Sequence, residues 1–114
     1  MHCVSIYPQD YSEANILKMK KLKSLCKNVG LSDHIEGVES SKVAIGEGAV
    51  IIEKHFTIDK SLPGRDNKFS ILPEQLKNLT DFIKNRELMF IDHGDGYNVK
   101  EKDSRINYTG RFNG

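Results

Sequence analysis

The sequence predicts an α/β fold in which parallel strands are joined by helical crossovers. Short runs rich in β-branched residues alternate with longer segments whose apolar residues recur at helical spacing, giving the order β-α-β-α-β-loop-α. Such alternation favours parallel strands, because a helix carries the chain back before the next parallel strand begins. In addition, the continuous apolar run Ala49–Ile52 is typical of a parallel strand that is buried on both faces.

The first two predicted elements are a strand and an amphipathic helix. β-branched residues dominate His2–Tyr7, and Pro8 ends this strand. We expect a helix over Ser12–Cys26, because apolar residues recur there at helical spacing while lysines fill the other faces. Ser12 is the expected N-cap, since its hydroxyl can accept a hydrogen bond from a free amide of the first turn. The lysines indicate a solvated face rather than a nucleic-acid patch, because no aromatic residues are interleaved with them.

The remaining elements follow in the same alternating order. Val29–Ser32 predicts a second strand, Val38–Glu47 a helix ended by glycines, and Ala49–Glu53 a third strand. Thr57–Ser70 is polar and rich in turn formers, so we expect a loop there. A last helix is expected over Pro73–Met89, with the proline in the first turn, where its missing N–H costs nothing.

Length and composition indicate one soluble domain of 114 residues, of which 38% are apolar and 29% are charged. No apolar run is long enough to span a membrane and no signal-peptide pattern is present, so we expect a cytoplasmic protein. The net charge of +1 argues against nucleic acid as the main partner. Cys3 and Cys26 are too few for a disulfide framework, and we expect them to be small buried side chains in a reducing compartment.

Polar residues gather where the three predicted strands end, and they are the candidate functional residues. The three clusters are Ser5 with Tyr7, Ser32–His34 and Glu53–His55. In a parallel sheet or barrel, sites form at the carboxyl ends of the strands. Neighbouring strands lie about 4.8 Å apart, so His34 and His55 could approach one ion together. Two imidazoles with open positions predict a catalytic divalent-metal site, and the alternative is that each histidine is an ordinary capping or loop residue.

Four other polar residues have simpler interpretations. Asp33 could orient His34, touch a substrate or cap the following turn. Asp66 lies in a turn-forming loop and, on local grounds, is a turn residue. His2 is expected to be structural within its strand, and His93 to be solvated. The chain has no P-loop, no dinucleotide-binding glycine motif, no C-x-x-C pair and no nucleophile elbow.

Four sequence blocks, taken together, point to a known family. They are His2–Pro8, Gly30–His34, Gly48–Thr57, and Gly64–Ser70 followed by Pro73-Glu74. From Met1 to about Met89, their order and spacing resemble those of the sialic acid synthase family, which contains the N-acetylneuraminate, legionaminate and pseudaminate synthases. The resemblance implies that residues 1–91 form the last three βα units of a TIM (β/α)8 barrel, whose full length is about 250 residues. Residues 92–114 are then a polar, poorly periodic C-terminal tail.

The resemblance also implies a reaction and roles for individual residues. The family condenses phosphoenolpyruvate with an N-acylated amino sugar, such as N-acetylmannosamine, to a nine-carbon 2-keto acid, with Mn²⁺ or Mg²⁺ as Lewis acid. In that picture His34 and His55 are the metal ligands. The resemblance implies that Ser5 and Ser32 contact phosphoenolpyruvate, and that Tyr7 and Asp66 contact the sugar. Asp33 and Glu53 are the supporting residues.

Departures from the family pattern limit what is expected of the chain alone. Some members have asparagine where Ser5 stands, and Arg65 adds a charge at the rim of the sugar pocket. The family's early strands, which grip the phosphate, and its antifreeze-like domain have no counterpart in the 114 residues; the ending Tyr108–Phe112 resembles members that stop after the barrel. We therefore expect the chain alone to be inactive. The alternative is a non-catalytic assembly module that self-associates or complements an N-terminal barrel piece through unpaired strand edges.

Overall fold

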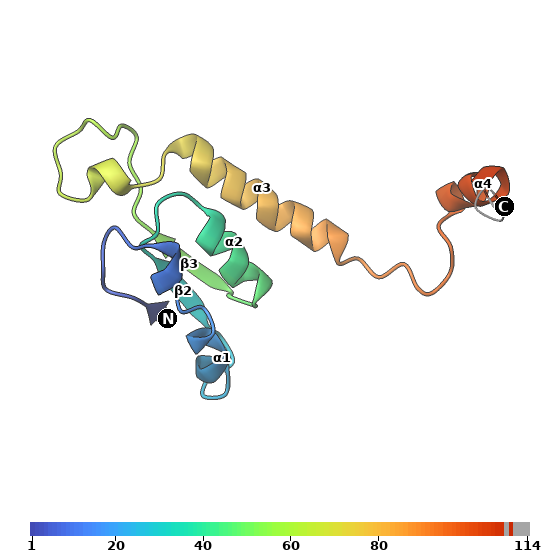
Figure 1. Cartoon of the computed structure of the whole chain (residues 1–114), viewed down its shortest axis with the longest axis horizontal. Helices are drawn as coiled ribbons and strands as arrows, with labels where there is room; N and C mark the ends of the chain where they lie inside the picture. Colours follow the sequence, from blue (N-terminus) through green and yellow to red (C-terminus); the bar gives the residue numbers. More distant parts are fainter. Residues whose placement is uncertain (109, 111–114) are drawn as a thin grey trace.

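The computed structural model describes residues 1–108 and 110. Three strands form one parallel sheet in the order β1-β2-β3 (Figure 1). The strands are β1 (His2–Cys3), β2 (Gly30–Asp33) and β3 (Ile51–Lys54). The parallel α/β arrangement expected from the alternating pattern is confirmed, since helices separate the strands along the chain.

Helices and 3-10 turns connect the three strands and follow the last one. They are η1 (Tyr11–Glu13), α1 (Lys18–Lys23), α2 (Glu39–Gly46), η2 (Asn67–Phe69), α3 (Pro73–Met89) and α4 (Val99–Tyr108). α2 packs on β2 and against α3, while α1 contacts β1. The expected helices at α2 and α3 are confirmed, with Pro73 in the first turn of α3. The side chain of Gln75 accepts a hydrogen bond from the Leu72 N–H at 2.9 Å, which satisfies a free amide at the start of this helix.

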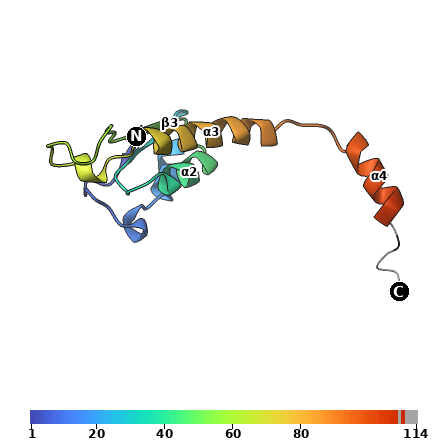
Figure 2. The same cartoon turned by 90° about the horizontal axis from the view of Figure 1, so that it is seen from above.

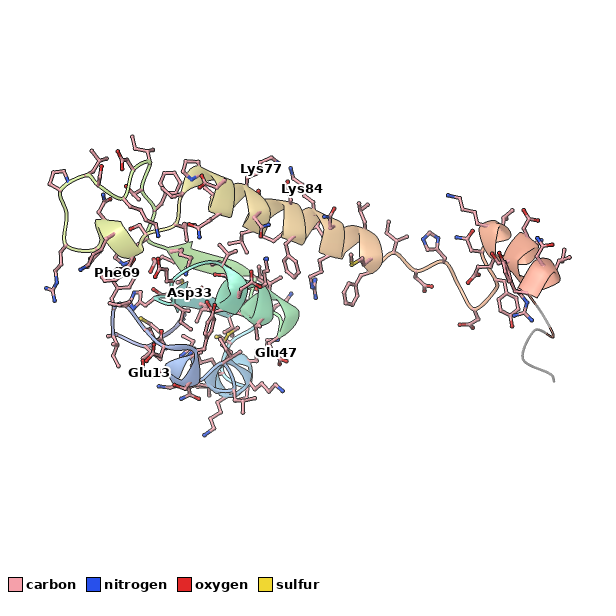
Figure 3. The ribbon with its side chains drawn as sticks, turned by 45° about the horizontal axis from the view of Figure 1, so that its top comes forward. Glu13, Asp33, Glu47, Phe69, Lys77 and Lys84 are labelled. Carbon is pink, nitrogen blue, oxygen red and sulfur yellow. The ribbon has the colours of Figure 1, made fainter. Side chains whose placement is uncertain are left out.

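Two small apolar clusters form the core between the sheet and its helices. The first contains Met19, Val29, Leu31 and Ala44, and the second contains Val38, Ile45, Ile71 and Leu79. Ile52 packs against both clusters, so β3 lies between them. Burial of this apolar area is the main favourable contribution to folding, at about 25 cal/mol per Å² removed from water. Figure 3 shows Asp33 inside the body, whereas Lys77 and Lys84 project outward from α3.

The other face of the sheet is open, and the expectation that the third strand is buried on both faces is wrong. Ile51 is 52% exposed and the preceding Val50 is 62% exposed. Side chains alternate along a strand, so Ile52 faces the helices while Ile51 and Glu53 face the opposite side. In the part of the chain that is described, no second layer covers that side.

The helix expected over Ser12–Cys26 is broken into two short pieces, and Ser12 is not its N-cap. Asn15 has a φ of 45°, in the left-handed region that interrupts a right-handed helix. A 3-10 turn therefore precedes α1, and Ser12 lies inside this turn. The N-cap of this turn is instead Asp10, whose N–H donates to the carboxylate of Glu13 at 2.9 Å.

The first strand is shorter than expected, and both cysteines are exposed rather than buried. The strand ends at Cys3 because the next carbonyl, that of Val4, accepts a hydrogen bond from the His34 ring. Cys3 alternates with the buried His2 and so lies on the open side of the sheet. Cys26 follows the end of α1, beyond the core. His2 is structural as expected, since its Nε2 lies 2.8 Å from the carbonyl oxygen of Ala14.

The tail contains a helix that the sequence pattern did not predict. Val99–Tyr108 forms α4, which lies apart from the sheet (Figures 1 and 2), while Thr109 and Arg111–Gly114 lie outside the described residues. The radius of gyration is 19.9 Å, against about 13 Å for a compact domain of this length. His93 is exposed, as expected. No helix within residues 1–108 is long and apolar enough to cross a membrane.

Candidate metal and substrate site

The two candidate metal ligands lie side by side at the carboxyl ends of neighbouring strands. β2 and β3 are paired in register, with Asp33 opposite Lys54, and a histidine follows each of these residues. The ring centroids of His34 and His55 are 5.5 Å apart, with an interplanar angle of 70°. The equal register of the two parallel strands therefore brings the imidazoles together, as the strand-end pattern predicted.

Tyr7 lies against both imidazoles. Its ring stacks on His55 at 4.4 Å and 21°, and meets His34 edge-on at 5.3 Å. Phe69, from η2, packs edge-on against the other side of Tyr7 at 5.7 Å. These four rings (Tyr7, His34, His55 and Phe69) form what we call the aromatic cluster. Such contacts restrict the rotation of each imidazole.

The His34 ring is oriented by a backbone carbonyl. Its Nδ1 lies 2.8 Å from the carbonyl oxygen of Val4, which can only accept, so Nδ1 carries the hydrogen. The lone pair then resides on Nε2. Histidines that bind metals have this arrangement, in which one ring nitrogen donates to a carbonyl or carboxylate and the other faces the ion.

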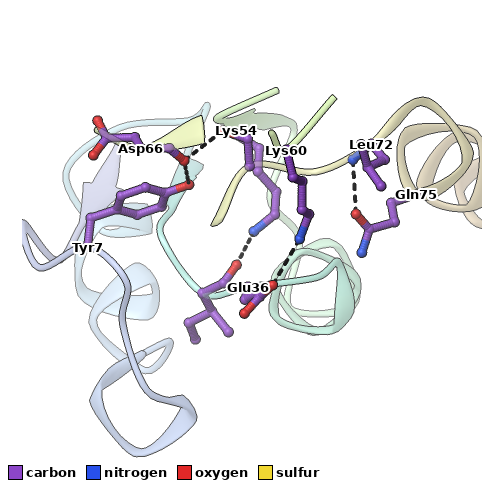
Figure 4. A network of polar contacts seen from close by, with 9 residues as sticks. Tyr7, Glu36, Lys54, Lys60, Asp66, Leu72 and Gln75 are labelled. Carbon is purple, nitrogen blue, oxygen red and sulfur yellow. Dashed lines mark hydrogen bonds and ion pairs between the residues drawn. The ribbon is translucent and has the colours of Figure 1, made fainter. Parts of the chain in front are cut away.

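Asp66 reaches the second imidazole from the loop before α3. One of its carboxylate oxygens is 3.8 Å from Nδ1 of His55, an ion-pair distance that is too long for a hydrogen bond. The carbonyl oxygen of Asp66 accepts hydrogen bonds from the hydroxyls of Tyr7 at 3.4 Å and Ser70 at 3.1 Å (Figure 4). The loop is thus tied to Tyr7, and this contact places Asp66 beside the aromatic cluster.

The two predicted serines differ in their surroundings. Ser32 donates to Oε1 of Glu53 at 2.7 Å across the open face of the sheet. This bond joins a predicted substrate contact to a predicted supporting residue. Ser5 is exposed and lies 3.9 Å from the Cys3 sulfur. Ser5 follows the carboxyl end of β1, and its hydroxyl has only this long contact where Ser32 has a short hydrogen bond to a carboxylate.

Asp33 points away from the imidazoles and toward α2. Its carboxylate accepts hydrogen bonds from the hydroxyls of Ser40, at 2.7 Å, and Ser41, and from the Ile35 N–H at 3.0 Å. The last bond caps the turn that contains His34, which was one of the interpretations left open by the sequence. Lys54 completes the group, with its Nζ 3.0 Å from the same carboxylate.

Lys54 belongs to the predicted strand-end cluster Glu53–His55, but the sequence assigned it no role. The alternation along a strand places Lys54 on the same side as Ile52, and the register observed in the structure places it directly opposite Asp33. Burial lowers the pKa of Lys54, and the Asp33 carboxylate partly opposes that shift. The pKa of Tyr7 shifts the other way. Burial raises the pKa of its phenol, a hydrogen bond with Ser70 opposes the rise, and the nearby Asp66, Glu36 and Asp33 carboxylates add to it.

Comparison with known proteins identifies the family. A sequence profile described as the NeuB family matches residues 1–95. The chain belongs to the NeuB family. The matched residues include both histidines and the loop with Asp66.

Among the NeuB-family relatives are the N,N'-diacetyllegionaminic acid synthases of two bacteria. The Legionella pneumophila protein is 46% identical over 88 residues, covering 76% of this chain and 25% of that protein. The Campylobacter jejuni protein is 39% identical over 108 residues, covering 94% and 31%. Both alignments lie in the C-terminal part of the relatives. This chain therefore spans about a quarter to a third of the length of these curated relatives.

A solved structure also matches the NeuB-family chain. The N-acetylneuraminic acid (sialic acid) synthetase of Leptospira borgpetersenii, in complex with citrate, superposes with a TM-score of 0.71 and 34% sequence identity. The match covers 98% of this chain and 39% of that structure. The expected resemblance to sialic acid synthases is thereby confirmed.

The donor set in this NeuB-family chain suits a divalent first-row ion. Nδ1 of His34 is bonded to a carbonyl, the outer partner common around bound metals, and Nδ1 of His55 lies 3.8 Å from a carboxylate without a hydrogen bond to it. Within residues 1–108, no group of three or more His, Cys, Asp or Glu side chains converges on one point.

Proposed function

We propose that this chain provides the metal-binding part of a sialic acid synthase-type enzyme. The reaction is the condensation of phosphoenolpyruvate with an N-acylated amino sugar, such as N-acetylmannosamine, to a nine-carbon 2-keto acid. The family relationship supports this proposal, since its relatives are named as synthases of legionaminic and sialic acids. The observation on which it depends is the apposition of His34 and His55, with Nδ1 of His34 occupied by a carbonyl.

We also propose that residues 1–91 are the last three βα units of a (β/α)8 barrel in a cytoplasmic enzyme. Three parallel strands with helices packed on one side support this proposal, because the helices of such a barrel lie outside its ring of parallel strands. The open side, with Ser32 and Glu53, would then face the barrel interior. The site would lie at the carboxyl ends of the strands, as in other enzymes of this fold.

The proposed roles follow from the positions of the side chains. His34 and His55 would hold Mn²⁺ or Mg²⁺, which supplies Lewis-acid polarisation of the sugar aldehyde when bound. Tyr7 and Asp66 lie beside the imidazoles, where they can contact sugar hydroxyls. Aromatic packing around His55 also excludes water from one side of its ring.

On the phosphoenolpyruvate side, Ser32 and Ser5 are the proposed contacts. The Ser32 proton is engaged with Glu53 at 2.7 Å. Ser32 must therefore rotate this proton toward a substrate oxygen, and Glu53 is then free to accept from a sugar hydroxyl or a water. Glu53 would in this way support the shell around the ion rather than bind it.

A second candidate function, assembly with another chain, is favoured by the exposed apolar surface. A groove of about 530 Å³ runs between β3, α2 and α3, and its apolar lining includes Val50, Phe56, Leu76 and Ile83. β1 and β3 are both edge strands. Unpaired parallel edges invite pairing, so we propose a complementing N-terminal barrel piece or a second copy as partner.

The assay for this proposal is phosphate release from phosphoenolpyruvate with N-acetylmannosamine and Mn²⁺. We expect the 114-residue chain alone to release none. Mixing it with the separately produced N-terminal part of the Legionella pneumophila relative should restore release, and a His55→Ala chain in the same mixture should not. Activity of the chain alone would refute the proposed inactivity. Equal activity of the native and His55→Ala mixtures would refute the catalytic role of the site.

A further inference from the structure

A buried ion pair lies behind the two histidines, on the face of the sheet that packs against α2. Lys54 Nζ is 3.0 Å from Oδ2 of Asp33, and the two side chains are 6% and 1% exposed. The two residues are register partners on β3 and β2, and each immediately precedes a histidine. The pair therefore joins the two chain segments that place His34 and His55.

The same ammonium group also fixes the backbone that follows His34. Lys54 Nζ donates to the carbonyl oxygen of Ile35 (Figure 4). The N–H of Ile35 donates to Oδ1 of Asp33 at 3.0 Å. Both backbone polar groups of Ile35, the residue after His34, are thus bonded to the ion pair, and the residue before His34 is Asp33 itself. The position of this imidazole relative to β3 depends on these bonds.

Stability alone does not account for such a pair. Removing two charges from water costs free energy that their attraction only partly offsets, and apolar residues of similar size would fill the same space. The pair differs from an apolar contact in being directional. Its hydrogen bonds allow one relative placement of the two strand ends, whereas apolar packing tolerates small shifts.

We propose that Lys54 and Asp33 are positioning residues that hold His34 and His55 in the apposition required to bind one divalent ion. This inference rests on the proposed metal site, and it assigns neither residue a contact with the ion. Substitutions of residues that orient metal ligands lower metal affinity by about 10- to 100-fold. Loss of the pair should have an effect of that size.

The test compares Mn²⁺ affinity of the 114-residue chain with that of the Asp33→Asn/Lys54→Met double variant. The double variant leaves no unpaired buried charge, so its fold is disturbed least. Lys60→Met is the matched control, because Lys60 pairs with Glu36 at 2.9 Å in the neighbouring loops. Free Mn²⁺ is measured by electron paramagnetic resonance and normalised to the folded fraction from circular dichroism. We expect the affinity to fall about 10- to 100-fold in the double variant and to stay native in the control.

A metal-free measurement separates this inference from the proposed function. In NMR spectra without metal, the Tyr7 ring should show contacts to both imidazoles in the native chain and in Lys60→Met, and should lose at least one of them in the double variant. Native Mn²⁺ affinity and native ring contacts in the double variant would overturn the positioning role. A native chain that binds no Mn²⁺, yet loses ring contacts in the double variant, would overturn the metal site and leave the positioning role standing. If the double variant does not fold, Lys54→Met alone is judged by the same two outcomes, because Asp33 keeps its hydrogen bonds from Ser40, Ser41 and the Ile35 N–H in that variant.

Discussion

Tyr7 connects both imidazoles to the loop that contains Asp66, so its ring should contribute more to stability than its hydroxyl does. The ring makes three contacts within the aromatic cluster, at centroid distances of 4.4, 5.3 and 5.7 Å. Aromatic pairs contribute about 0.5 to 1.5 kcal/mol each beyond area burial, and we use the lower value because Tyr7 is only half-buried. Three such contacts give about 1.5 kcal/mol. Lost burial raises the expected cost of Tyr7→Ala to about 2 to 3 kcal/mol.

Tyr7→Phe is the matched control, because it keeps the ring and removes only the hydroxyl. The hydrogen bond to Asp66 is long, at 3.4 Å, so its loss should cost at most about 0.5 kcal/mol. The free energy of unfolding is measured by urea titration with circular dichroism. If the two variants were equally stable within about 0.5 kcal/mol, the ring contacts would not hold the cluster together, and our account of how Asp66 is placed would be wrong.

Two further predictions concern pH and strand pairing. The pKa of Tyr7 is raised in the folded chain, so the contribution of its neutral phenol to stability should be fully present below the usual tyrosine pKa of about 10 and should be lost as the pH rises through the folded pKa. Urea titrations between pH 8 and 11 should therefore show a smaller fall in the free energy of unfolding for Tyr7→Phe than for the native chain. An identical fall would count against the burial of this phenol. Gly30→Ala would place a Cβ 2.6 Å from the carbonyl oxygen of Ile51, so β2 and β3 must separate, at a cost of about 1 to 3 kcal/mol. Gly46→Ala is the control, because a Cβ at Gly46 would meet no atom within 4 Å; this variant should be neutral or stabilise α2 by up to about 1 kcal/mol. Equal thermal midpoints for the two variants would contradict the close contact between β2 and β3.

The pairing of the histidines was predictable because it depends on the order of elements and not on details of packing. Parallel strands end at the same edge, and His34 and His55 each directly follow a strand. A one-residue shift in register would have moved one imidazole to the other face. The apolar pattern specifies that register, since Leu31 and Ile52 must both face the helices.

Other features depend on contacts that no local pattern encodes. Asn15 adopts a left-handed conformation and interrupts a helix that the periodicity favoured. The orientation of His34 depends on the Val4 carbonyl, 30 residues away in the chain. Lys54 lies in a polar strand-end cluster, and only the strand register reveals that it meets Asp33 in the interior. Such long-range polar contacts become visible only once the strands are placed.

The central claim is that two imidazoles of this chain bind one divalent ion, and a Mn²⁺ titration of three variants tests it most directly. His34→Ala and His55→Ala each remove one ring from the apposed pair, whereas His93→Ala removes an exposed ring in the tail. Our account predicts that each of the first two variants loses at least about tenfold in affinity, and that His93→Ala binds as the native chain does. Equal affinity in all three variants would contradict the site.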